Sequence, residues 1–139
     1  MNKNPIKVDS IPQQLTEYII PLQHAQTMIY VTLKVKLLDT GWLFASAHTI
    51  FLELDNRYPK KTPEPEDLKL ARAADLEGQR LNIRSHISRF RDGSDDDKPS
   101  RVEYKLIIEA GDQLLDQFVE TSGDKNPTDF NTFIKFILQ

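Results

Sequence analysis

Apolar and polar residues alternate along much of the chain, a pattern typical of half-buried β-strands. The clearest run covers residues 27–39, where every second side chain is aliphatic. Many of these side chains are β-branched, which favours a strand over a helix. The apolar positions of the run are Ile29, Val31, Leu33, Val35 and Leu37.

The alternation returns in five later segments, so the sequence predicts about six strands in all. Gly111 and Asp112 separate two of these segments and predict a tight type II′ hairpin. No regular alternation of strands with helices occurs, so we expect a mainly β fold, either an antiparallel β-sandwich or a barrel. The five later segments are residues 44–55, 80–90, 101–110, 113–120 and 129–139.

The remaining segments are less regular. Residues 13–20 lie between two prolines and suit either one helical turn or a strand at a sheet edge. Residues 55–66 contain three prolines among charges and are predicted to form a loop. Residues 67–78 are rich in helix formers and end in Gly78, so we expect a short helix there, although its first leucines alternate as in a strand. The fold thus includes one or two short helical segments.

The length of 139 residues predicts a single domain over residues 1–139. No cysteine is present, so disulfides, thiolate metal sites and a cysteine nucleophile are excluded. The first residues carry no apolar run of the kind that a secretory signal needs, and no apolar stretch is long enough for a transmembrane helix. We therefore expect a cytoplasmic protein with no membrane partner.

The charge balance gives no general reason to expect a nucleic-acid partner, since 18 basic residues face 21 acidic ones for a net charge of −3. One cluster of arginines nevertheless suits an oligonucleotide-binding barrel, with Phe90 as a stacking partner, if the arginines share one side of the sheet. The acidic run at residues 92–97 would repel phosphate, so a solvated face is the simpler hypothesis. The cluster consists of Arg80, Arg84, Arg89 and Arg91, with Arg101 at the start of the next strand.

Metal chemistry has two weak candidates. His48 and His86 are expected on the polar faces of two strands, where they could meet and bind a metal with Glu103. The acidic run at residues 92–97 lacks the residue order of a calcium-binding EF-hand loop, and we interpret it as an exposed hairpin tip. None of the three histidines is in a metal-binding motif, so we predict no metal and no cofactor.

Motifs for catalysis do not occur either. No serine has the context of a nucleophile elbow, and no glycine-rich phosphate loop is present. We therefore expect no enzymatic activity, the alternative being a small-molecule-binding barrel or small enzyme that uses an interior cavity.

Apolar residues on both faces of one strand are the best indication of function. In the last segment, Phe133 and Ile137 oppose the inward-facing set that includes Phe130 and Phe136, and Ile107 has a similar outward position on residues 101–110. Such residues need a cover from another layer or another subunit. We therefore predict a protein interface at Ile107, Phe133 and Ile137. The predicted function is a non-catalytic interaction or assembly module that self-associates or docks on a larger protein.

Overall fold

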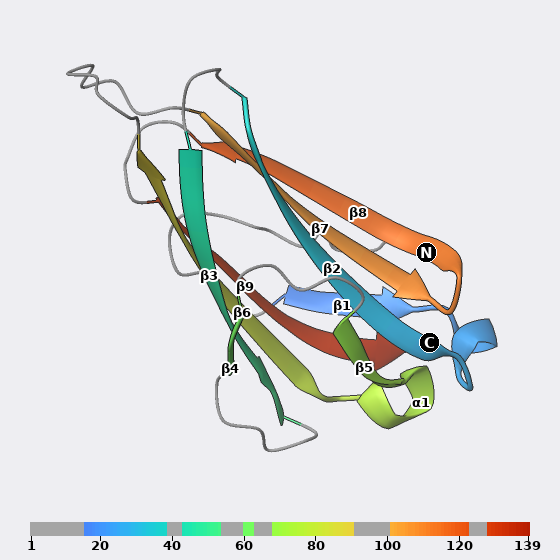
Figure 1. Ribbon diagram of the computed structural model, residues 1–139. Helices are drawn as coiled ribbons and strands as arrows, with labels where there is room; N and C mark the ends of the chain where they lie inside the picture. The colour runs from blue at the N-terminus through green and yellow to red at the C-terminus, as the bar shows by residue number, and fades with distance from the viewer. Residues whose placement is uncertain (1–15, 39–42, 54–59, 63–67, 91–100, 123–127) are drawn as a thin grey trace.

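The computed structural model describes residues 16–38, 43–53, 60–62, 68–90, 101–122 and 128–139. In these residues two β-sheets pack face to face (Figure 1). The first sheet contains, in spatial order, β1 (Thr16–Ile20), β9 (Thr128–Leu138), β6 (Arg80–Phe90), β3 (Leu43–Leu52) and β4 (Lys60–Thr62). The second sheet contains β5 (Leu68–Arg72), β2 (Met28–Leu37), β7 (Val102–Ala110) and β8 (Gln113–Ser122).

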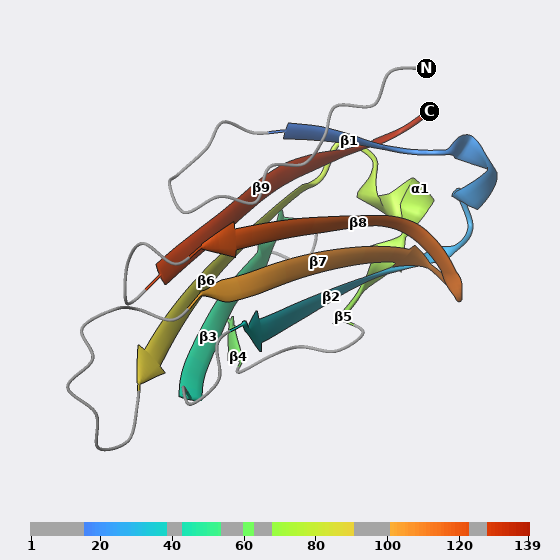
Figure 2. The ribbon, with the colours of Figure 1, turned by 90° about the horizontal axis from the view of Figure 1, so that it is seen from above.

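The predicted mainly β, antiparallel sandwich is therefore confirmed, and the two separate sheets exclude a closed barrel among the described strands. Neighbouring strands pair antiparallel except β1 and β9, which run parallel. The predicted hairpin connects β7 to β8, and Gly111 adopts a φ of 58° in its turn. From above, β2, β7 and β8 form one layer and β3, β6 and β9 the other (Figure 2).

Several consecutive strands belong to different sheets. The chain passes from the first sheet to the second between β1 and β2, β4 and β5, and β6 and β7. It returns to the first sheet between β2 and β3, β5 and β6, and β8 and β9. The interpretation of residues 92–97 as a hairpin tip was wrong, because β6 and β7 belong to different sheets and do not pair with each other. The acidic run itself lies outside the described residues.

The short elements combine the alternatives that the sequence left open. β1 at the edge of the first sheet is followed directly by a 3₁₀ turn, η1 (Leu22–His24). β5 likewise precedes the short helix α1 (Ala73–Leu76), which confirms a helix before Gly78 and adds a strand. β4 was missed, because it lies within a segment whose prolines predicted only a loop.

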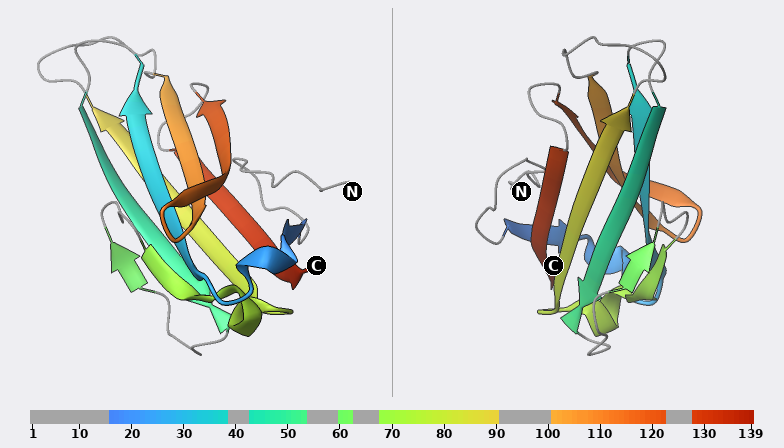
Figure 3. Two further views of the ribbon diagram at one scale, coloured as in Figure 1. Left: turned by 90° about the vertical axis from the view of Figure 1, so that its right-hand side faces the viewer. Right: turned by 60° about the vertical axis from the view of Figure 1, so that its left-hand side comes forward.

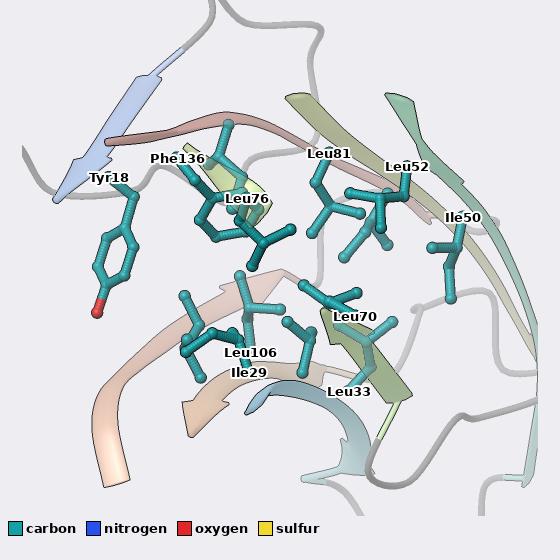
Figure 4. Close-up of a cluster of buried hydrophobic side chains, with 14 of the residues drawn as sticks. Tyr18, Ile29, Leu33, Ile50, Leu52, Leu70, Leu76, Leu81, Leu106 and Phe136 are labelled. Carbon is teal, nitrogen blue, oxygen red and sulfur yellow. The ribbon is translucent and has the colours of Figure 1, made fainter. Parts of the chain in front are cut away.

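The apolar core fills the space between the sheets at the end where α1 lies (Figure 4). Leu76 of α1 is fully buried and lies near Phe136 and Leu81. Tyr18 of β1 reaches toward the second sheet and makes edge-to-face contacts with Phe118 at 6.3 Å and Phe136 at 6.4 Å between ring centroids. No helix in the described part of the chain is long and apolar enough to cross a membrane.

Candidate functional site

The apolar core continues to the other end of the interior, where polar side chains are buried together with Ile87 and Val102. His48 of β3 contacts Ser85 of β6 through Nδ1 and Oγ at 2.6 Å, and the same Oγ lies 2.7 Å from the hydroxyl of Tyr104 on β7. The ring of Tyr104 stacks on Phe130 with 4.6 Å between centroids. The three polar residues are at most 2% exposed, and burial raises the pKa of Tyr104 well above its usual range. These groups form a buried chain of hydrogen bonds that links the two sheets.

Arg89 is a further buried polar residue at this end of the interior. The residue is 3% exposed, and its guanidinium donates a hydrogen bond to Thr128 Oγ1 at 2.6 Å. Burial lowers the pKa of Arg89, because the charged form loses hydration. The side chain of Arg89 points inward because side chains alternate between the two faces of a strand, and Arg89 shares a face of β6 with the buried Ile87.

The arginines therefore do not share one side of the sheet, as the nucleic-acid alternative required. Arg84 and Arg80 lie on the outer, exposed face of β6, opposite Arg89. Arg80 donates two hydrogen bonds to Glu53, at 2.9 Å and 3.1 Å, which lower the pKa of Glu53. Arg91 lies outside the described residues.

The prediction of a polar, outward-facing position is confirmed for His86 but was wrong for His48, and the alternative in which the two histidines meet does not hold. β3 and β6 are neighbours, but the register pairs His48 with Ser85 and Ala47 with His86, so the two imidazoles are on opposite faces. Within the described ranges, no group of three metal-binding side chains is close enough to hold an ion.

A second histidine contact lies on the outer face of the first sheet. His86 of β6 contacts Asp129 of β9, with 2.6 Å between Nδ1 and Oδ1, and its Nε2 lies 3.5 Å from Oγ of Ser88. The side chains of His86 and Asp129 are 54% and 69% exposed. β6 thus presents one serine–histidine contact to the interior and another to solvent. Figure 3 shows β6 between β3 and β9.

The predicted interface residues divide between the two sheets. Phe133 and Ile137 are half-buried on the outer face of β9, where Ile137 is paired with Ile19 of β1. Ile107 is half-buried on the outer face of β7, in the other sheet. Ile107 therefore cannot extend the patch of Phe133 and Ile137, because the two outer faces point away from each other.

Two exposed aliphatic residues that the sequence reasoning missed lie on β8, diagonally across from Ile107. The register places Gln117 of β8 beside Ile107, and it places Leu114 and Val119 beside Glu109 and Lys105 on the same outer face. Leu114 is 55% exposed and Val119 is 49% exposed. β8 is also the edge strand of its sheet, with β7 as its partner among the described strands. We call Ile107, Leu114 and Val119 the β8 patch.

Comparisons with known proteins assign no function to these surfaces. No family model matches the chain, and no curated protein matches it. A structural match is a domain of unknown function, DUF4425, from Bacteroides vulgatus ATCC 8482. The match has a TM-score of 0.38 and 8% sequence identity, and covers 78% of this chain and 94% of that one.

Proposed function

We propose that the protein is an interaction or assembly module that binds a partner protein by strand addition at β8. The observation that carries the proposal is the β8 patch, which places half-exposed aliphatic side chains along a ten-residue edge strand. An edge strand offers a row of backbone N–H and C=O groups to a further strand, and neighbouring apolar side chains add specificity.

The patch can supply useful binding energy. Complete burial of a leucine or valine side chain is worth roughly 1.5–3 kcal/mol, and about half of Leu114 and Val119 remains to be buried. Together the two residues offer about 1.5–3 kcal/mol, or roughly tenfold to a hundredfold in affinity. Such a contribution supports a modest interface after association costs are included.

Charge favours another protein over a second copy of this chain. Residues 113–122 of β8 include Asp116 and Glu120 and no basic residue, and Asp112 lies in the preceding turn. Antiparallel pairing of β8 with its own copy would bring like charges together, which is destabilising. The matching partner is an extended segment in which Lys or Arg alternates with aliphatic residues.

Two synthetic peptides test the proposal, one alternating valine with lysine and the other alternating valine with glutamate. We expect the lysine peptide to bind and to perturb the backbone amide resonances of β8, and the glutamate peptide to bind much more weakly. Added salt should weaken the binding. The double variant Leu114→Ser with Val119→Ser should lose about tenfold in affinity.

Leu22→Ser is the matched control, because Leu22 is 63% exposed but lies in η1. This variant should bind the lysine peptide as the native protein does. Equal loss in both variants, or amide changes confined to the first sheet, would overturn the proposal. A native dimer with β8 amides protected from exchange would show that the partner is a second copy instead.

A further inference from the structure

The outer face of the first sheet carries a serine and a histidine on β6 and a carboxylate on β9, in the arrangement that activates a serine hydroxyl. Asp129 contacts His86 Nδ1 at 2.6 Å, and Ser88 Oγ lies 3.5 Å from His86 Nε2. In the tautomer that carries its proton on Nδ1, His86 donates a hydrogen bond to Asp129. The lone pair of Nε2 then faces the serine hydroxyl. Distances of this length in an unliganded site are common and shorten when substrate binds.

The topology explains why these three residues meet. The antiparallel register of β6 and β9 sets His86 directly opposite Asp129. Ser88 is two residues further along β6, so it projects from the same face as His86. The fold therefore holds the group on two hydrogen-bonded strands rather than on a loop, which limits its freedom.

Among the described residues, the neighbours of Ser88 on β3 leave room for a substrate. On the neighbouring strand β3, the positions paired with Ser88 and His86 are Ala45 and Ala47, whose side chains are small. The next pair on this face is Leu43 with Phe90, about 7 Å from Ser88 by strand geometry. Leu43 is 55% exposed and Phe90 is 49% exposed. An apolar acyl chain can lie on this pair while its carbonyl is near Ser88.

We infer that Ser88 is a nucleophile that accepts an acyl group from an ester with an apolar acyl chain. Ser88 Oγ attacks the carbonyl carbon while its proton passes to His86 Nε2. The bond from the carbonyl carbon to the leaving oxygen then breaks, and the leaving group takes the proton from the imidazolium. The products are acyl-Ser88 and the free alcohol or phenol. Asp129 is a positioning residue that holds the imidazole.

The sheet also limits the rate of this reaction. From Leu81 to Ile87, β6 pairs with both β3 and β9, so the backbone N–H groups of this part are used in the two ladders and are not free to stabilise an oxyanion. We therefore expect slow, stoichiometric acylation rather than rapid turnover. This inference uses the outer face of the first sheet and is independent of the β8 patch.

The interior pair on the same strand provides a contrast. Ser85 lies closer to its histidine, at 2.6 Å from His48 Nδ1, but Ser85 is only 2% exposed. Its second neighbour is the hydroxyl of Tyr104 at 2.7 Å, and burial excludes an ester from the site. Ser85 should therefore remain unmodified.

Incubation with p-nitrophenyl butyrate tests the inference. We expect release of p-nitrophenolate, one butyryl group per chain by intact mass, and the adduct on Ser88 by peptide mapping. Ser88→Ala should abolish this adduct, and Asp129→Asn should slow its formation about tenfold or more. Both substituted residues lie on the outer face of the first sheet, and melting temperatures verify that each variant is folded.

The pH dependence separates chemistry from structure. In the native protein the acylation rate should rise with pH because His86 acts as a general base, and His86→Gln should remove this dependence. Thr49→Ala, a change on the same outer face at the register partner of Arg84, should react as the native protein does. No adduct on Ser88, or equal acylation of Ser88 in the native protein and His86→Gln, would overturn the inference.

Discussion

The two buried threonines of β9 differ in their hydrogen bonds. Thr128 Oγ1 accepts a hydrogen bond from Arg89, whereas the hydroxyl of Thr132 has no partner in the described part of the chain. A buried hydroxyl without a partner costs about 1–3 kcal/mol. We therefore expect Thr132→Val to raise the free energy of unfolding by about 1 kcal/mol, measured by denaturant titration.

Thr128→Val is the matched control for that experiment. Both threonines are at most 1% exposed and lie on the same strand, so the change in shape is equal. This variant should lower the free energy of unfolding by about 1.5–3 kcal/mol, because it removes a hydrogen bond to a charged group. Equal effects of the two substitutions would contradict the assignment of partners.

Tyr18 should make the protein sensitive to alkali. Burial raises the pKa of Tyr18 from 10.0 to about 12, because the phenolate would lose hydration between the sheets. Above pH 10 the unfolded chain therefore releases a proton that the folded chain keeps. The free energy of unfolding should fall between pH 10 and 12, by about 2 kcal/mol from this group.

Tyr18→Phe should remove part of this decline. Denaturant titrations at pH 8 and at pH 11.5 measure it in both proteins. Some decline will remain, since burial also raises the pKa of Tyr104. If Tyr18→Phe loses as much stability as the native protein over this range, the pKa of Tyr18 is the same in the folded and the unfolded chain.

Residue type misled the sequence analysis at two interior positions. The alternation of side chains along a strand places His48 on the same face as Ile50 and Leu52, and Arg89 on the same face as Ile87. All of these side chains face inward. Polar and charged residues are rarely buried, so both residues were predicted to face outward in spite of their positions in the alternating pattern. Their burial depends on partners from other strands, namely Ser85, Tyr104 and Thr128, which no local pattern can reveal.

At the level of elements, the β7–β8 hairpin depends on Gly111. Its φ of 58° is strained for residues with a side chain, and an added Cβ would lie 3.4 Å from Thr27 Cγ2. We expect Gly111→Ala to lower the free energy of unfolding by about 1–2 kcal/mol. Gly111→Asn should cost less, since asparagine tolerates this conformation better, and thermal melts compare the two variants.

Gly78 is a useful comparison for the hairpin variants. Its φ is 77°, but no atom of the described residues, its two chain neighbours apart, lies within 4 Å of an added Cβ. Gly78→Ala should therefore show the cost of backbone strain alone. If it proves as costly as Gly111→Ala, the contact with Thr27 contributes nothing.

Strands were predictable from the sequence, but their assignment to sheets was not. Alternation in residues 27–39 and 129–139 identifies β2 and β9, because each strand has one buried face. The pairing of His86 with Asp129 requires β6 and β9 to be neighbours, although 37 residues separate the end of β6 from the start of β9. Loop composition does not reveal whether the chain returns to the same sheet or crosses to the other.

For the molecule as a whole, self-association through the first sheet stays a prediction. Phe133 and Ile137 are half-buried on its outer face, with Ile19 beside Ile137. If this strip is an interface, the native protein should be an oligomer at tens of micromolar by light scattering. Phe133→Asp with Ile137→Asp should then be monomeric and folded.

A native protein that is monomeric at this concentration would contradict the self-association. Loss of folding in the double variant would show that the strip supports the fold rather than an interface. Circular dichroism separates these two outcomes. The β8 patch is on the other sheet, so the double variant should still bind the lysine peptide.

The parallel pairing of β1 with β9 means that the first sheet can be completed only after β9 has been synthesised. Thr16 pairs with Ile134, so of the described strands the one synthesised first takes its place beside the one synthesised last. Until translation reaches β9, Tyr18 and Ile20 lack the strand that covers them. Contacts this distant along the chain slow folding and leave apolar strands open to aggregation. During translation β1 is therefore open to aggregation, and the first sheet is complete only when β9 has been made.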